Sequence, residues 1–123
     1  MEMPKRTVLD VGNCAPDFAG IKKMLTSHFD VDVVQADRSS DALAIISKRS
    51  VDLVLINRKL DCDYSDGTAV LADIKAVSDV PVMIVTNYDE HQDAAVSLGA
   101  ERGFGKLELN SEETIRKLAP FLS

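Results

Sequence analysis

The segment VDLVLIN, residues 51–57, decides the fold of this chain. Its residues 53–56 form a continuous apolar run. A short run without polar alternation is typical of a parallel strand that is covered on both faces. Further short runs rich in Val, Ile and Leu lie at residues 8–11, 31–34 and 82–85, and a weaker one surrounds Phe104. The sequence therefore predicts five strands of a buried parallel sheet.

Helix-like segments separate these runs. Pro16 suits the first turn of a helix over the first connection, and Ser39 or Ser40 is expected to cap the second. Residues 67–77 place apolar side chains on one face, which predicts a third helix.

Two capping boxes predict where the last two helices begin. Asp89 with Gln92 opens the fourth helix and Asn110 with Glu113 opens the fifth. Gly99 is a natural terminator of the fourth helix. The regular βα alternation predicts one α/β domain over residues 1–123, a doubly wound five-stranded parallel sheet with helices on both faces. In such folds the functional crevice lies beyond the carboxyl ends of the strands.

Composition narrows the class of protein. The net charge is −6 and the isoelectric point about 4.8, which argues against direct nucleic-acid binding. No apolar stretch has the roughly 20 residues of a membrane helix, and the first residues do not resemble a signal peptide. Cys14 and Cys62 do not form a disulfide framework. We therefore expect a cytoplasmic protein that binds neither nucleic acid nor membrane.

Three segments carry a resemblance to a known family. They are VDLVLIN at residues 51–57, DVPVMIVTNY at 79–88 and LGAERGFGK at 98–106. In this order and spacing they resemble the receiver domains of response regulators, and the likeness covers essentially the whole chain. It implies a flavodoxin-like sheet with strand order 2-1-3-4-5 and a role in two-component (phosphorelay) signal transduction.

The same resemblance exposes departures at the phosphorylation site. Family receivers carry a phosphoaccepting aspartate after the third strand, and this position holds Asn57. The pair of acids that helps to hold Mg²⁺ falls on Gly12 and Asn13, or on Asn13 and Cys14. An amide is a poor nucleophile and a weak ligand for a hard cation. The resemblance therefore predicts no catalytic residue and weak or absent Mg²⁺ binding, with no other cofactor.

Other positions of the family pattern are mixed. Thr86 and Lys106 match the residues that contact the phosphoryl oxygens. The aromatic residue of the family's conformational switch is replaced by Gly103, and the proline after the lysine is Leu107. We interpret the chain as a pseudo-receiver, not an enzyme, that works by protein–protein interaction with a signalling partner. By analogy with the family, the last strand and last two helices would form the interface, for a partner or for a homodimer.

Two alternatives remain open at this point. The first is a working phosphoacceptor in which Asp10, Asp61 or Asp63 replaces the missing acids. The second is a regulatory domain whose Thr86 and Lys106 bind a small anion. In the absence of either function, Lys106 is expected to hydrogen-bond Asn57 or a nearby carbonyl group.

Overall fold

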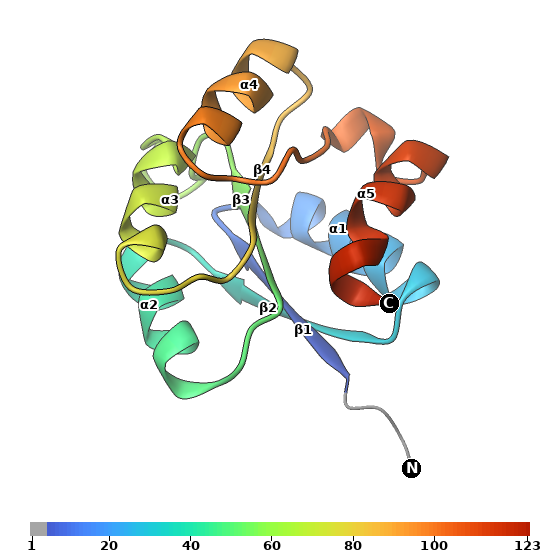
Figure 1. Cartoon of the computed structure of the whole chain (residues 1–123), viewed down its shortest axis with the longest axis horizontal. Coiled ribbons are helices and arrows are strands. Elements are labelled where there is room, and N and C mark those ends of the chain that lie inside the picture. The colour runs from blue at the N-terminus through green and yellow to red at the C-terminus, as the bar shows by residue number, and fades with distance from the viewer. Residues whose placement is uncertain (1–4) are drawn as a thin grey trace.

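The computed structural model describes residues 5–123 and contains a parallel sheet between two layers of helices (Figure 1). Its strands are β1 (Arg6–Val11), β2 (Val31–Ala36), β3 (Leu53–Asn57) and β4 (Val82–Val85). They are arranged in the order β2-β1-β3-β4. All three pairings are parallel. The doubly wound α/β fold predicted from the sequence is confirmed.

The helices cover both faces of this sheet. They are α1 (Ala15–His28), α2 (Ser39–Lys48), α3 (Gly67–Lys75), α4 (Asp89–Ser97) and α5 (Glu112–Leu122), with a 3₁₀ turn η1 (Lys106–Glu108) before α5. Figure 1 shows α1 and α5 on one side, and α2, α3 and α4 on the other. Within residues 5–123, no helix combines the length and the apolar character needed to cross a membrane.

Alternate residues of the strands feed two separate apolar cores. Leu9, Val54 and Ile84 face the core under α2, α3 and α4. Val8, Leu55 and Met83 face the core under α1 and α5. Side chains on neighbouring positions of a strand point to opposite faces, so strands buried on both sides need apolar residues in succession. This requirement explains the continuous run in residues 53–56.

The prediction of a fifth strand around Phe104 is wrong. Residues 101–105, which we call the edge segment, run beside β4 but pair with it only at an isolated parallel bridge between Met83 and Glu101. The side chain of Gln92 is buried and bonds both Ile84 and Gly103. An amide side chain therefore lies where the backbone ladder would continue, and within residues 5–123 the sheet has four strands rather than five.

The predicted helix caps also differ from the structure. No side-chain cap bond precedes α2, and Ser39 instead donates to Asp73 at 2.6 Å. The box of Asp89 and Gln92 does not form, since Gln92 turns into the interior. At α5 the cap is Ser111, whose Oγ accepts from the backbone N–H of Thr114 at 3.1 Å. Gly99 does end α4, with a φ of 103° that favours glycine.

Candidate functional site

The carboxyl ends of β3 and β4 border a small cavity of about 210 Å³. The loop after β4 and the start of η1 complete its wall. Its polar lining combines cations with neutral groups, and no carboxylate from residues 5–123 lines it. The lining residues are Asn57, Arg58, Lys59, Val85, Thr86, Asn87, Tyr88 and Lys106.

Asn57 is half-buried at the end of β3. Its Nδ2 donates a hydrogen bond to the carbonyl oxygen of Gly12 at 3.3 Å. The same carbonyl accepts from the backbone N–H of Asp61 at 2.8 Å. Asn57 thus ties the loop after β1 to the end of β3. A neutral donor in this place supplies neither a nucleophile nor an anionic metal ligand.

Gly12 and Asn13 form the turn after β1. Gly12 has a φ of +81°, and a Cβ there would collide with the side chain of Leu60, so the turn requires glycine. Asn13 is buried, and its Nδ2 donates to Oδ1 of Asp10 at 2.5 Å. Asn13 therefore faces the interior of the domain rather than the cavity. Cys14, the next residue, is half-buried with a free thiol.

Asp10 is fully buried on β1, on the face that α1 and α5 cover. Burial raises the pKa of its carboxyl group to about 7, although the bond from Asn13 and the charge of Lys106 act in the opposite direction. Oδ2 of Asp10 and Oδ1 of Asn13 have no hydrogen-bond partner among the described residues. A carboxyl group this deeply buried is held partly in its neutral form near pH 7, and it does not line the cavity.

Lys106 is held by a residue that the sequence did not point to. Its Nζ donates to Oδ2 of Asp17, in the first turn of α1, at 2.7 Å. The prediction that Lys106 bonds Asn57 or a nearby carbonyl group is therefore wrong. The Lys106 ammonium lowers the pKa of the Asp17 carboxyl group. The two partners are 89 positions apart in the sequence, which explains why no local pattern reveals the pair.

Thr86 faces the start of α4. Its Oγ1 accepts from the backbone N–H of Tyr88 at 3.3 Å and lies 3.3 Å from Nδ1 of His91. The rings of Tyr88 and His91 meet edge to face at 5.4 Å. The hydroxyl group of Thr86 is thereby engaged in holding the loop before α4.

The acidic loop after β3 does not gather its carboxylates. Asp63 accepts from the backbone N–H and the hydroxyl group of Ser65, and Asp66 pairs with Lys59 instead of capping α3. No group of three His, Cys, Asp or Glu side chains within residues 5–123 is placed to hold a metal ion. Cys62 is exposed and, like Cys14, unpaired.

The family's Mg²⁺ is a poor fit for the groups at this end of the sheet. Gly12 has no side chain, Asn13 is turned to Asp10, and Asn57 offers one amide oxygen. Mg²⁺ in proteins is bound through one or two carboxylates together with phosphate and water. None of these three positions supplies a carboxylate.

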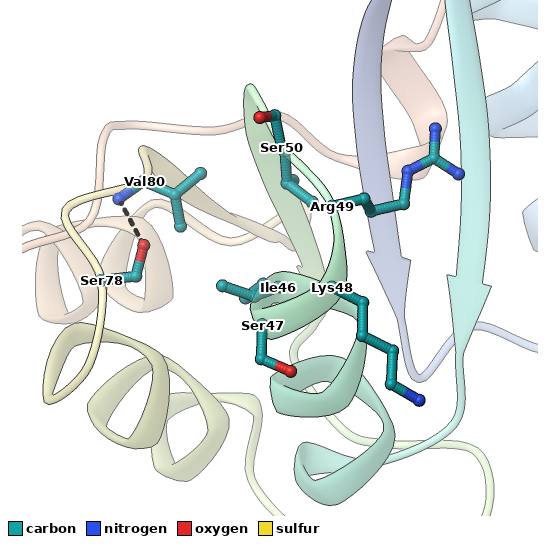
Figure 2. A pocket seen from close by; sticks show the side chains of 8 residues that line it. Ile46, Ser47, Lys48, Arg49, Ser50, Ser78 and Val80 are labelled. Carbon is teal, nitrogen blue, oxygen red and sulfur yellow. Dashed lines mark hydrogen bonds between the residues drawn. The ribbon is translucent and has the colours of Figure 1, made fainter.

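A larger cavity of about 500 Å³ lies at the opposite end of the sheet, where α2 leads into β3 (Figure 2). Some of its polar groups are used within the domain: Ser78 accepts from the backbone N–H of Val80, and Ser47 donates to the carbonyl group of Ala44. Arg49 extends towards β1, where it bonds Thr7. Lys48 and Ser50 also line this cavity.

Comparison with known proteins identifies the architecture. The family model for the response regulator receiver domain matches residues 17–108. No curated protein matches the chain, whereas 145 chains of solved structures do.

Among those structures are two receiver proteins of similar size to this chain. The receiver domain of Francisella response regulator 1452 has 21% identity and a TM-score of 0.77, covering 95% of this chain and 97% of its own. The chemotaxis response regulator CheY4 of Vibrio cholerae has 16% identity and a TM-score of 0.69, covering 95% of each.

The Salmonella typhimurium response regulator RcsB is longer. It has 18% identity and a TM-score of 0.74 over 90% of this chain, which spans only 57% of the RcsB chain. At such identities the likeness to solved structures shows the fold.

Proposed function

This chain belongs to the response regulator receiver domain family of two-component signalling, and from that premise we propose that it is a pseudo-receiver. It would transmit a signal by binding a protein partner, without being phosphorylated and without acting as an enzyme. The observation that carries the proposal is the chemistry of the crevice. Its cavity has no carboxylate among the described lining residues, and a neutral amide stands at the acceptor position.

The neighbouring groups support the same proposal. Phosphoryl transfer to a carboxylate needs positive charge placed around the transferred oxygens. Lys106 is engaged by Asp17, and Thr86 is engaged by Tyr88 and His91. Among the candidates to replace the acceptor, Asp10 is fully buried, while Asp61 and Asp63 are exposed loop residues outside the cavity lining. These arrangements favour a structural use of the former site.

The partner surface that we propose is formed by α4, the edge segment and α5. On α4 it carries exposed Val96, which follows Asp93 by three residues and so lies on the same side of the helix. The same surface is the one we propose for self-association. A strict monomer by light scattering at high protein concentration would exclude the homodimer. We also propose a cytoplasmic location, since two free thiols suit a reducing compartment.

The experiment for the proposal is a Mg²⁺ titration followed by amide NMR, in the wild type and in Asn57→Asp. We expect no Mg²⁺-dependent shifts at residues 12–14 or 57 in the wild type. In Asn57→Asp we expect only weak, unsaturated shifts, since the single new carboxylate lacks the acidic pair. Saturable millimolar or tighter binding by the wild type would refute a dismantled metal site.

One observation favours a second candidate, non-covalent binding of a small anion. The cavity lining contains three cations, Arg58, Lys59 and Lys106, in a chain of net charge −6. Titration with inorganic phosphate would test it, with Arg58→Gln as the variant that should lose binding. Shifts that are identical in both proteins would dismiss the candidate.

A further inference from the structure

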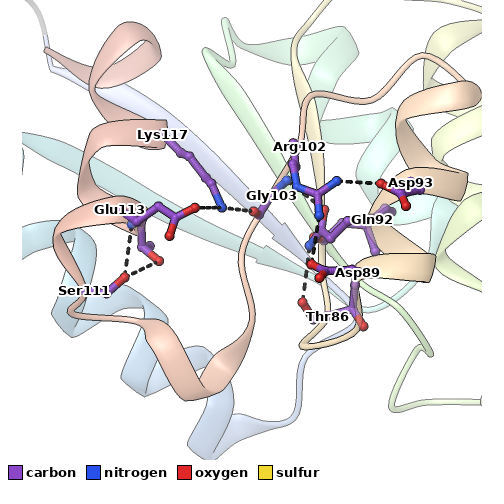
Figure 3. Close-up of polar contacts among 11 residues, drawn as sticks. Thr86, Asp89, Gln92, Asp93, Arg102, Gly103, Ser111, Glu113 and Lys117 are labelled. Carbon is purple, nitrogen blue, oxygen red and sulfur yellow. Dashed lines mark hydrogen bonds and ion pairs between the residues drawn. The ribbon is translucent and has the colours of Figure 1, made fainter.

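The side chain of Gln92 occupies an unusual place between α4, β4 and the edge segment (Figure 3). It is buried, with 4% of its surface exposed. Its Nε2 donates to the carbonyl oxygen of Ile84 at 2.9 Å and to that of Thr86 at 3.3 Å. Its Oε1 accepts from the backbone N–H of Gly103 at 2.8 Å. One helix side chain thus bonds both neighbouring backbones.

These bonds replace one rung of a parallel ladder. On one side the N–H of Glu101 donates to Val82 at 2.8 Å, and on the other the N–H of Thr86 donates to Phe104 at 3.0 Å. Between them a regular ladder would join Gly103 directly to Ile84. The amide of Gln92 provides the donor for Ile84 and the acceptor for Gly103 instead.

Gly103 makes this insertion sterically possible. A Cβ at this position would collide with the carbonyl oxygen of Ile84 and approach Cβ of Met83 to 3.1 Å. A larger residue would push the edge segment away from β4 and separate Gly103 from Oε1 of Gln92. The hydrogen bond between Gln92 and Gly103 therefore requires glycine at position 103.

Other contacts fasten the edge segment at the surface. Arg102 pairs with Asp93 at 2.7 Å and with Asp89 at 2.8 Å, and Lys117 of α5 donates to the carbonyl oxygen of Gly103 at 3.2 Å (Figure 3). The two aspartates are largely exposed, and exposed ion pairs contribute little. Gln92, whose polar atoms would be left unpaired in the interior, contributes more.

We propose that the side-chain amide of Gln92 fastens α4 to β4 and to the edge segment, and so holds the face of α4, the edge segment and α5 in one conformation without any signal. This inference deepens the proposed function, because that face is the surface we propose for the partner. It makes the surface permanently available, as a module without phosphorylation requires.

Hydrogen exchange and relaxation dispersion by NMR test this fastening in the intact chain. In the wild type, we expect the side-chain amide protons of Gln92 to be protected from exchange, unlike those of exposed Asn110, and α4 to show no microsecond-to-millisecond dispersion. In Gln92→Leu, the Gly103 amide should exchange about 10-fold faster or more relative to Glu101. Dispersion should then appear in α4.

Arg102→Gln is the matched control, because it removes the two surface ion pairs and leaves Gln92 in place. We expect Gly103 exchange to be unchanged in it. An equal acceleration in Arg102→Gln would overturn the proposal, as would wild-type Gln92 side-chain protons that exchange as fast as those of Asn110. If Gln92→Leu does not fold, the wild-type protection and dispersion data decide alone. Phosphorylation of a chain with a rigid α4 would refute the proposed function but leave this fastening intact.

Discussion

Asp10→Asn is the substitution whose effect the structure specifies most closely. Burial raises the pKa of the Asp10 carboxyl group from 3.8 to about 7 in the folded chain. The folded state therefore binds this proton more tightly than the unfolded state. The resulting contribution to stability is complete below pH 3.8 and is lost as the pH rises to about 7. Above that pH the fold carries the full cost of burying the charge.

The change in the free energy of unfolding follows from the size of the pKa shift of Asp10. Each pKa unit corresponds to about 1.36 kcal/mol, so the full shift corresponds to roughly 4 kcal/mol. An amide at position 10 does not titrate, and it supplies a donor in place of Oδ2, which has no partner among the described residues. We expect Asp10→Asn to be more stable than the wild type at pH 8. Its advantage should shrink by about 2 to 3 kcal/mol at pH 5.

Urea unfolding of both proteins at several pH values between 5 and 8 measures this difference. Other titrating groups are common to the two proteins, so they largely cancel in the comparison. A difference in unfolding free energy that does not change with pH would show that Asp10 keeps an ordinary pKa, and would refute the account of its burial.

Three further substitutions probe separate features. Gly12→Ala introduces a Cβ that collides with Leu60 at a φ of +81°. We therefore expect thermal unfolding to show a loss of about 2 kcal/mol or more in the free energy of unfolding. An unchanged melting temperature would contradict the geometry of this turn. Ser111→Ala removes the bond to Thr114 at 3.1 Å and should lower the free energy of unfolding by about 1 kcal/mol, whereas Asn110→Ala should lower it little. A larger loss in Asn110→Ala than in Ser111→Ala would show that Asn110 is the cap, as the sequence predicts. Lys106→Met should raise the pKa of Asp17, which Lys106 lowers, towards its ordinary value in a carboxyl-carbon NMR titration; no change would mean that the pair does not form in solution.

The strands were predictable because burial on both faces leaves a local mark. The runs at residues 53–56 and 82–85 needed no partner to be recognised, and β3 and β4 lie there. The positions of Asn57, Thr86 and Lys106 followed from the strand ends and from the family resemblance. All three do line one cavity, which the structure shows directly.

The details of the site were hidden because they depend on contacts between distant parts of the chain. Asp17 and Lys106 are 89 residues apart, so no spacing rule connects them. Gln92 matched a capping box in the sequence, yet the unpaired backbone groups of Ile84 and Gly103 offered it better partners in the interior. The missing fifth strand has the same cause. The secondary-structure propensity of a local segment does not indicate that a side chain from elsewhere will replace a backbone hydrogen bond of the ladder.

The most direct test of the central claim is the intact mass of the wild-type chain after incubation with Mg²⁺ and acetyl phosphate, beside a receiver domain that has an aspartate acceptor. A neutral Asn57 and a cavity without a described carboxylate predict no phosphoryl adduct on this chain, while the control gains one. A stoichiometric phosphoryl adduct on the wild type would contradict the account, and mapping it would identify the residue that accepts the group.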